Sequence, residues 1–255
     1  MALTLSVAII TKNEEANLAR TLESVRWADE IVIVDCGSTD RTAEIARTFG
    51  VKFFVEEWKG FGAQKNSALA KGSGDWVLAL DADEEVSPEL AEEIRALLNS
   101  SPAQEAYFLP RRNYFLGRWI RHGGYYPDRK LRLFRQGGCR FEESVVHETI
   151  RPAGPAGHLR GNLLHHAYPT LDSYIEHMNR YSALGATQAV ARGKTSRGLA
   201  AFFWNVFIVP VATFKYNYLF RLGFLDGREG FLLHMYHSAY VSWKYAKAWA
   251  KRPRS

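Results

Sequence analysis

Two aspartates, one residue apart, follow a short apolar run in the first half of the chain. The run Trp76–Leu80 is wholly apolar, as expected of a strand buried on both faces of a parallel sheet. Asp81 and Asp83 come directly after it in a D-x-D pattern, and parallel sheets bind ligands outside the carboxyl ends of their strands. Carboxylates there suit Mg²⁺ or Mn²⁺, which can also hold a diphosphate. The alternative is an acidic loop before a helix that starts at Ser87–Glu89 with a serine cap and a proline.

Polar residues also follow two earlier apolar runs. The run Leu3–Thr11 ends in a polar segment, Thr11–Glu14. The run Glu30–Asp35 ends at Asp35, which starts a turn that reaches Asp40. If these runs are parallel strands, their polar ends lie at the same edge of the sheet as the aspartate pair. Taken singly, these residues are equally explained as helix caps, an acidic first helical turn and turn-forming side chains.

The elements that would position these residues alternate between strands and helices. The expected strands are Leu3–Thr11, Glu30–Asp35, Val51–Val55 and Trp76–Leu80; the expected helices are Ala16–Val25, a helix capped by Thr39 or Asp40 that ends at Phe49, Gly62–Lys71 and Pro88–Leu98. This alternation predicts βαβ units, and therefore an α/β fold with a mostly parallel sheet. Further on, we expect short strands at Tyr107–Pro110, Tyr114–Leu116 and Leu131–Phe134 and a helix at Thr170–Arg192.

Composition is that of a globular protein. The 255 residues are 47% hydrophobic and 24% charged, enough for one α/β domain and a tail. The two cysteines have no zinc-type spacing, which favours a reducing compartment. The first residues lack a basic segment followed by a cleavage site, so we expect a strand there and no signal peptide.

Charge is distributed unevenly along the chain. Residues 1–100 carry 10 Lys and Arg against 18 Asp and Glu, whereas residues 192–255 carry 11 against 2. A basic tail indicates an anionic partner, either nucleic acid or a phospholipid surface.

The tail combines this charge with apolar and aromatic residues. The run Leu199–Phe214 is strongly apolar, but its 16 residues, interrupted by Asn205 and Pro210, are fewer than the roughly 20 of a membrane span. Lysines and arginines alternate with Trp and Tyr in the residues that follow, which is typical of a helix at a bilayer interface. We therefore expect an anionic membrane surface and no nucleic acid as partner, with a helical lid packed on the domain as the alternative.

Four stretches together resemble the family 2 glycosyltransferases, which are inverting enzymes of the GT-A fold. They are Ile10–Glu14, Val34–Asp40, Ala63–Asn66 and Asp81–Asp83. Within the family, the stretches Val146-His147-Glu148 and Leu225-Asp226-Gly227-Arg228-Glu229-Gly230 are similar to the branch of bacterial lipopolysaccharide core glucosyltransferases. The resemblance covers residues 3–100 most strongly.

The resemblance implies roles for individual residues in binding a UDP-sugar. The residues expected at the donor are Thr11, Asn13, Glu14, Asp35, Asp40, Lys65 and Asp81, with Asp35 near the uracil or ribose. Asp83 would ligate Mg²⁺ or Mn²⁺, and His165 would complete the metal shell or be a core histidine. Lys65 would neutralise phosphate or be a solvated side chain.

The chemistry of the family requires one general base that deprotonates the acceptor hydroxyl. Candidates are Asp128, Glu142, Glu143 and Glu148, and Glu148 is preferred because of the Val-His-Glu match. His147 beside it is a ligand, an acceptor contact or a packed imidazole. Basic residues crowd the same region, namely Arg111, Arg112, Arg118, Arg121, Arg129, Lys130, Arg132 and Arg135. They favour a phosphorylated or acidic acceptor, unless they pair with the acidic N-terminal half.

We therefore expect a bacterial, metal-dependent hexosyltransferase that moves glucose from a UDP-sugar to a lipopolysaccharide-core or other glycolipid acceptor. Residues 1–100 would be the nucleotide-sugar half of the GT-A domain, residues 101–192 the acceptor half and residues 193–255 a helical tail. The protein would be cytoplasmic and peripherally bound to the inner membrane. Alternatives are another polysaccharide or protein acceptor, a sugar nucleotidyltransferase, or a non-catalytic membrane-binding module. The absence of glycine from Thr11–Glu14 counts against a nucleotidyltransferase, which would need a glycine-rich phosphate loop.

Overall fold

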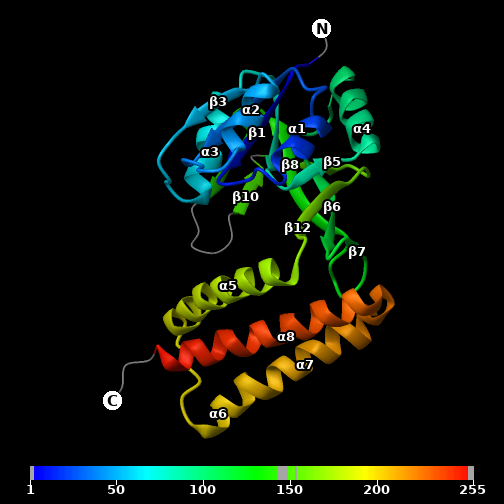
Figure 1. Cartoon of the computed structure of the whole chain (residues 1–255). Helices are drawn as coiled ribbons and strands as arrows, with labels where there is room; N and C mark the ends of the chain where they lie inside the picture. The colour runs from blue at the N-terminus through cyan, green and yellow to red at the C-terminus, as the bar shows by residue number, and fades with distance from the viewer. Residues whose placement is uncertain (1–2, 101, 143–148, 153, 252–255) are drawn as a thin grey trace. The chain divides into compact units, whose positions relative to one another are not determined.

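The computed structural model describes residues 3–100, 102–142, 149–152 and 154–251 (Figure 1). The chain forms two compact units, the first from residues 1–111 and 128–165, the second from residues 112–127 and 166–255. The predicted division at residues 100 and 192 is a division by function, and it stays a prediction.

The first unit is built on a sheet with the strand order β3-β2-β1-β4-β8-β6-β12-β5. Its strands are β1 (Leu5–Thr11), β2 (Glu30–Asp35), β3 (Lys52–Val55), β4 (Trp76–Asp81), β5 (Glu84–Val86), β6 (Ala106–Phe115), β8 (Asp128–Arg135) and β12 (Leu163–Tyr168). Strand β11 (Ala156–His158) also pairs with β6. Strands β9 (Cys139–Glu142) and β10 (Thr149–Pro152) form a separate two-stranded sheet. Strands β3, β2, β1 and β4 are parallel, whereas β8 joins β4 antiparallel. The predicted α/β fold with parallel βαβ units is therefore confirmed, and antiparallel strands extend the sheet beyond β4.

Helices cover both faces of this sheet because its strands are apolar on both sides. The helices are α1 (Leu18–Ser24), α2 (Thr42–Thr48), α3 (Phe61–Lys71) and α4 (Pro88–Asn99). Alternate β4 residues face two separate cores: Trp76 packs with residues of α1, α2 and α4, and Val77 packs with residues of α3. The predicted cap of α4 is confirmed, since Ser87 accepts a hydrogen bond from the Leu90 amide.

Some boundaries differ from the sequence prediction. The two short strands expected at Tyr107–Pro110 and Tyr114–Leu116 are one continuous strand, β6. The polar residues between them pointed to a loop, but Arg111 continues the strand opposite Asp128 of β8. Helix α2 starts after Arg41, and neither Thr39 nor Asp40 is its N-cap residue.

The second unit is mainly helical. It holds the ends of β6 and β12, β7 (Arg118–Ile120), α5 (Leu171–Ala191), α6 (Leu199–Phe203), η1 (Trp204–Ile208), α7 (Val209–Lys215), η2 (Tyr216–Phe220), η3 (Gly223–Asp226) and α8 (Gly227–Ala250). Helix α8 packs against α5 and against α7 (Figure 1). Thr170 caps α5 by accepting a hydrogen bond from the Ser173 amide.

The segments α6, η1, α7 and η2 form one continuous helix, Leu199–Phe220, which we call the α6–η2 helix. Among the described residues it is the one helix long and apolar enough to cross a membrane, with 22 residues and a mean hydropathy of 1.4. From the sequence we expect an apolar run of 16 residues, too short to span a membrane. The helix that contains this run has 22 residues, so the expectation is wrong about length. A π-helical turn directly before Pro210 widens the backbone, which lets the helix continue through a residue that lacks an N–H.

Candidate active site

The polar strand ends of the first unit meet at one edge of its sheet. In the parallel register, Thr11 of β1 lies opposite Asp35 of β2, and Ile10 lies opposite Asp81 of β4. Three segments that the sequence singled out are therefore neighbours because of how their strands pair.

Asp35 is almost fully buried and organises the turn that follows β2. Its carboxylate accepts hydrogen bonds from the Thr11 hydroxyl at 2.9 Å and from the Ser38 amide at 2.7 Å. The turn chemistry that the sequence offered as an alternative is thus present. Oδ1 also accepts from the Ser38 hydroxyl, so Oδ2 is the oxygen that has a lone pair left for a further ligand.

The loops after β1 and β2 are joined by reciprocal hydrogen bonds. Asn13 has a positive φ of 56°. Its backbone N–H donates to the Ser38 hydroxyl at 2.8 Å, and its side-chain Oδ1 accepts from the Thr39 backbone N–H at 2.8 Å. Asp40 accepts from the Glu15 amide at 3.0 Å.

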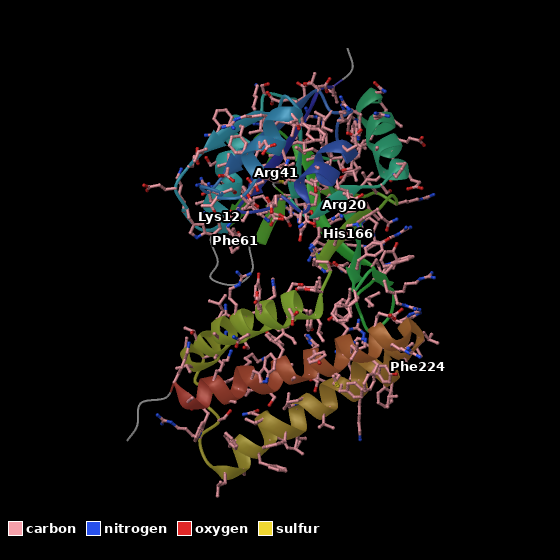
Figure 2. The ribbon with its side chains drawn as sticks, viewed as in Figure 1. Lys12, Arg20, Arg41, Phe61, His166 and Phe224 are labelled. Atoms are coloured by element: carbon pink, nitrogen blue, oxygen red, sulfur yellow. The ribbon has the colours of Figure 1, made fainter. Side chains whose placement is uncertain are left out.

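The Lys12 ammonium, labelled in Figure 2, donates to the carbonyls of Cys36 at 2.9 Å and Gly37. These bonds, together with the hydrogen bonds of Asn13 and Asp40, hold the loops after β1 and β2 to each other. We call the joined loops the rim.

Glu14 places a third carboxylate near the aspartate pair. Its amide donates to the Thr42 hydroxyl at 2.8 Å, and its carboxylate accepts from the Asn17 side chain at 2.9 Å. Burial raises the pKa of Glu14; the Asn17 hydrogen bond opposes this, and the charges of Asp83, Asp40 and Asp81 raise it further. A cation bound beside these carboxylates would relieve that repulsion.

Asp81 is neutralised by two cations. Lys65 Nζ lies 2.8 Å from one carboxylate oxygen, and the Arg132 guanidinium donates to the other. Burial alone would raise the pKa of Asp81, but Arg132 and Lys65 hold it well below its usual value. Lys65 is only 12% exposed at its side chain, so it is not the solvated lysine offered as an alternative.

Behind Asp81 lies a buried ionic network that sequence reasoning did not assign. Glu84, which is fully buried, accepts from Arg111 and from Arg132, each at 3.0 Å. Arg111 also pairs with Asp128 at 2.7 Å. The signal in the sequence was the basic stretch itself. Pairing with the acidic N-terminal half holds for Arg111 and Arg132, whereas Arg135 pairs with Glu105, beyond that half, at 2.7 Å.

The two predicted metal ligands lie together. His165 Nε2 is 3.3 Å from a carboxylate oxygen of Asp83. They meet because β12 pairs antiparallel with β5, which sets His165 opposite Glu84. Burial alone would raise the pKa of Asp83, but the hydrogen bond from His165 holds it below its usual value.

This pair fits a divalent ion that is completed by other ligands. Within the described part of the chain, no cluster of three or more His, Cys, Asp or Glu side chains is arranged around a common point. A carboxylate and an imidazole supply two ligands, and the phosphates of a nucleotide and water would supply the rest.

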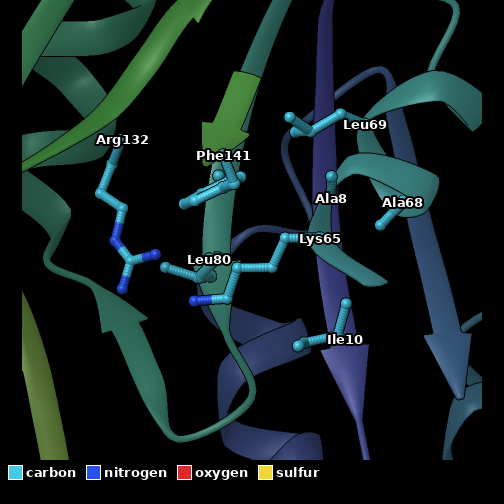
Figure 3. A pocket seen from close by; sticks show the side chains of 9 residues that line it. Ala8, Ile10, Lys65, Ala68, Leu69, Leu80, Arg132 and Phe141 are labelled. Atoms are coloured by element: carbon cyan, nitrogen blue, oxygen red, sulfur yellow. The ribbon is translucent and has the colours of Figure 1, made fainter. Parts of the chain in front are cut away.

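A small pocket lies between β1, β4 and α3, next to Arg132 of β8 and Phe141 of β9 (Figure 3). The residues lining it are Ala8, Ile10, Lys65, Ala68, Leu69, Ala79, Leu80, Arg132 and Phe141. Its walls are apolar except for Lys65 and Arg132, and Lys65 Nζ lies 5.2 Å from the centre of the Phe141 ring. The two cations of the pocket are the ones that pair with Asp81, so the pocket is apolar apart from this ion-paired side.

The candidate bases divide between described and undescribed residues. Glu148 and Glu143 lie outside the described residues, and so does His147, the expected ligand, acceptor contact or packed imidazole. Glu142 is exposed at the end of β9. Burial would raise the pKa of Asp128, but Arg111 and Lys130 hold it below its usual value, which makes Asp128 a weaker base.

A mixed α/β sheet with a parallel core, a D-x-D pair at the end of the parallel strand β4 and a histidine of β12 beside that pair is typical of the class of GT-A nucleotide-sugar transferases. Residues 6–151 match the family described as "Glycosyl transferase family 2". The chain belongs to this family and is a glycosyltransferase, which confirms the predicted family, fold class and enzyme type.

Individual relatives support the family assignment. The "Lipopolysaccharide core biosynthesis glycosyltransferase LpsC" of Rhizobium meliloti is 38% identical over 88% of this chain and 82% of that protein. An uncharacterized glycosyltransferase of Rickettsia typhi is 34% identical over 74% of this chain and 69% of that protein. The chain also resembles the structure of S. aureus TarS 1-349 in complex with UDP, with a match that covers 97% of this chain and 90% of that chain at 15% identity and a TM-score of 0.49.

Proposed function

We propose that this chain is an inverting, metal-dependent hexosyltransferase that moves glucose from a UDP-sugar to a lipopolysaccharide-core or related glycolipid acceptor. The observation that carries the proposal is the Asp83–His165 pair beside the neutralised Asp81, at the carboxyl ends of the sheet strands. The name of the Rhizobium meliloti relative supports the acceptor class.

In this proposal the rim formed by the loops after β1 and β2 binds the nucleoside. Asp35 faces the uracil or ribose, and Thr11, Asn13, Glu14 and Asp40 hold the loops that cover it. Lys65 and Arg132 keep Asp81 ionised on the side of the ribose and sugar, and Lys65 also faces the diphosphate.

Asp83 and His165 would hold Mg²⁺ or Mn²⁺. When bound, such an ion supplies Lewis-acid stabilisation of the negative charge that develops on the UDP leaving group. Glu148 would accept the proton of the acceptor hydroxyl, which needs one base and no covalent intermediate.

The chain would work on the cytoplasmic face of a bacterial inner membrane, where a lipid-linked acceptor is available. Residues 1–100 would bind the donor and residues 101–192 the acceptor, while residues 193–255 would contact the membrane surface. The basic and aromatic character of the tail supports this placement.

Turnover of purified protein with a panel of UDP- and GDP-sugars, with Mg²⁺, Mn²⁺ or EDTA, tests the proposal. We expect release of glucose from UDP-glucose that requires a divalent ion. Equal turnover in EDTA would overturn the metal assignment, and a preference for a GDP-sugar would overturn the donor.

A further inference from the structure

The α6–η2 helix presents an apolar stripe on its outer side. Its large apolar side chains there are between 36% and 90% exposed: Leu199, Phe203, Trp204, Phe207, Ile208, Val211, Tyr216, Leu219 and Phe220. Of the 18 most apolar consecutive residues of this helix, only 11% are buried in the protein. An apolar surface of this extent on a helix marks an interaction site, because water is a poor solvent for it.

The opposite side of the helix is fixed to α8. Val206 and Pro210 are buried, and their carbonyls accept hydrogen bonds from the hydroxyls of Ser242 at 2.9 Å and Ser238 at 2.7 Å. The α6, η1, α7 and η2 segments each contact α8. The helix cannot leave α8 without losing these contacts along its whole length.

Helix α8 is unsuited to the hydrocarbon layer. Its charged residues Arg228, Glu229, Lys244 and Lys247 lie near its two ends, and the stretch between them, which includes His234 and His237, does not make α8 apolar enough to cross a membrane. Lys247 also donates to the Asn179 side chain and the Ser182 hydroxyl of α5, both at 2.6 Å. Since α8 stays outside the bilayer core, the helix bound along it cannot cross the membrane by itself.

Cations stand at both ends of the apolar stripe. Arg192, Lys194 and Arg197 precede it, and Lys215 and Arg221 lie at its far end, all of them exposed. In a helix that spans a bilayer, the two groups would face opposite membrane surfaces. In a helix that lies flat, all five reach the headgroups of one leaflet.

The apolar surface continues around the turn into α8. Leu222, Phe224 (labelled in Figure 2), Leu225 and Phe231 are each more than 40% exposed. A second copy of the chain could also cover an apolar face, but the cations bordering this one are complementary to anionic lipid and would repel an identical surface.

We infer that the α6–η2 helix lies flat in the interface of a bilayer that contains anionic phospholipid, with its apolar stripe among the acyl chains and its terminal cations at the headgroups. This deepens the membrane placement proposed above and rests on it. It does not depend on the donor, the metal or the base.

Binding to sedimented vesicles tests the insertion. The full chain is mixed with phosphatidylcholine vesicles with or without phosphatidylglycerol. We expect Val211→Glu to weaken partitioning by about tenfold or more, because it places a charge among acyl chains. Val55→Glu is the matched control, since Val55 is a similarly exposed valine on β3, and it should bind as the native chain does. Equal binding by Val211→Glu and the native chain would overturn the inference.

A charge-reversal variant tests the contribution of the cations at one end of the apolar stripe. Lys194→Glu with Arg197→Glu should weaken binding to phosphatidylglycerol vesicles by about tenfold at low salt, with a smaller effect at high salt because exposed charges are screened. Binding by the native chain that vanishes completely at high salt would contradict insertion of the apolar stripe.

Spin labels measure the orientation. Labels are placed at Phe203→Cys, Val211→Cys or Leu219→Cys in a chain whose Cys36 and Cys139 are replaced by serine, and their depth is read from oxygen and nickel accessibility. A flat helix gives three similar, shallow depths, whereas a spanning helix gives the greatest depth at position 211. The second result, or spin–spin broadening without vesicles that reveals a dimer through this face, would overturn the inference. Either result leaves UDP-sugar turnover untouched, so failure of the inference and failure of the proposed function are distinguishable.

Discussion

The two aspartates of the D-x-D pair have different surroundings. Asp81 is held by Lys65 and Arg132, which compensate its charge within the protein. Asp83 is paired with a histidine, whose neutral imidazole nitrogen can add one ligand to an ion that the carboxylate binds. These surroundings support the proposal that Asp83 ligates the metal and that Asp81 faces the ribose and sugar.

Asp83→Asn tests this assignment directly. The amide keeps the shape of the side chain but removes the charge, so we expect turnover to fall by about 100-fold or more while the melting temperature stays close to native. Glu92→Gln, at an exposed position of α4, is the control for loss of a carboxylate and should be as active as the native chain. Near-native turnover of Asp83→Asn in Mg²⁺ or Mn²⁺ would show that another residue holds the ion.

Glu148→Gln tests the proposed base. Removing a general base lowers turnover by roughly 10²-fold or more, whereas affinity for UDP should be unchanged because the acceptor side alone is affected. Glu143→Gln is the neighbouring comparison. A loss in Glu143→Gln with full activity in Glu148→Gln would move the base to residue 143.

The strands of the first unit are tied together by the buried charges behind the site. Arg132 of β8 bridges Asp81 of β4 and Glu84 of β5, and Arg111 of β6 joins the same network. Removing one cation from such a buried network leaves uncompensated charge, which costs more than the ion pair itself contributes.

Arg132→Met should therefore lower the free energy of unfolding by about 3–5 kcal/mol. Arg26→Met removes a comparable arginine from an exposed pair with Glu23 and should change it by at most about 1 kcal/mol. Denaturant titration of both variants measures the difference. Equal, small losses would mean that the network carries little of the stability of the sheet.

Helix α8 contains a buried imidazole that makes the second unit sensitive to acid. His234 packs against Gly123 and Gly223, where any side chain would collide with its ring. Burial lowers the pKa of His234 to about 4; the His237 charge lowers it too, and Asp226 opposes this.

Because the unfolded chain takes up this proton at the ordinary pKa of histidine, near 6.5, and the folded chain only near pH 4, stability falls as pH drops between these values. We expect His234→Leu to show a shallower loss of unfolding free energy between pH 7 and pH 5 than the native chain. His158→Leu, at an exposed histidine, should follow the native slope. Identical slopes in all three chains would contradict this account of His234.

The sequence predicts elements well where one local signal dominates. The apolar runs of β1, β2 and β4 identify buried strands, and Ser87-Pro88 marks the start of α4. It failed at β6, where Arg111 looks like a loop residue until Glu84 and Asp128 neutralise it. It also indicated that the apolar run Leu199–Phe214 is short for a span, because nothing in the local pattern shows that the helix continues past Pro210 to Phe220.

At the scale of the whole molecule, the site depends on pairings between distant parts of the chain. Ordered motifs predicted that Asp35 and Asp81 share an edge, since parallel βαβ units bring their strand ends together. Asp83 and His165 are 82 residues apart, and the antiparallel pairing of β5 with β12 joins them. Their proximity was expected from the family resemblance alone, because no local pattern encodes that pairing.

Calorimetric titration of UDP into the full chain, with Mn²⁺ or with EDTA, tests the central claim most directly because it needs no acceptor. We predict that Mn²⁺ tightens UDP binding by tenfold or more, an effect of about 1.4 kcal/mol, and that Asp83→Asn abolishes this gain while Glu92→Gln retains it. UDP affinity that is the same in Mn²⁺ and in EDTA, or a full Mn²⁺ effect in Asp83→Asn, would contradict a metal-held diphosphate at Asp83 and His165.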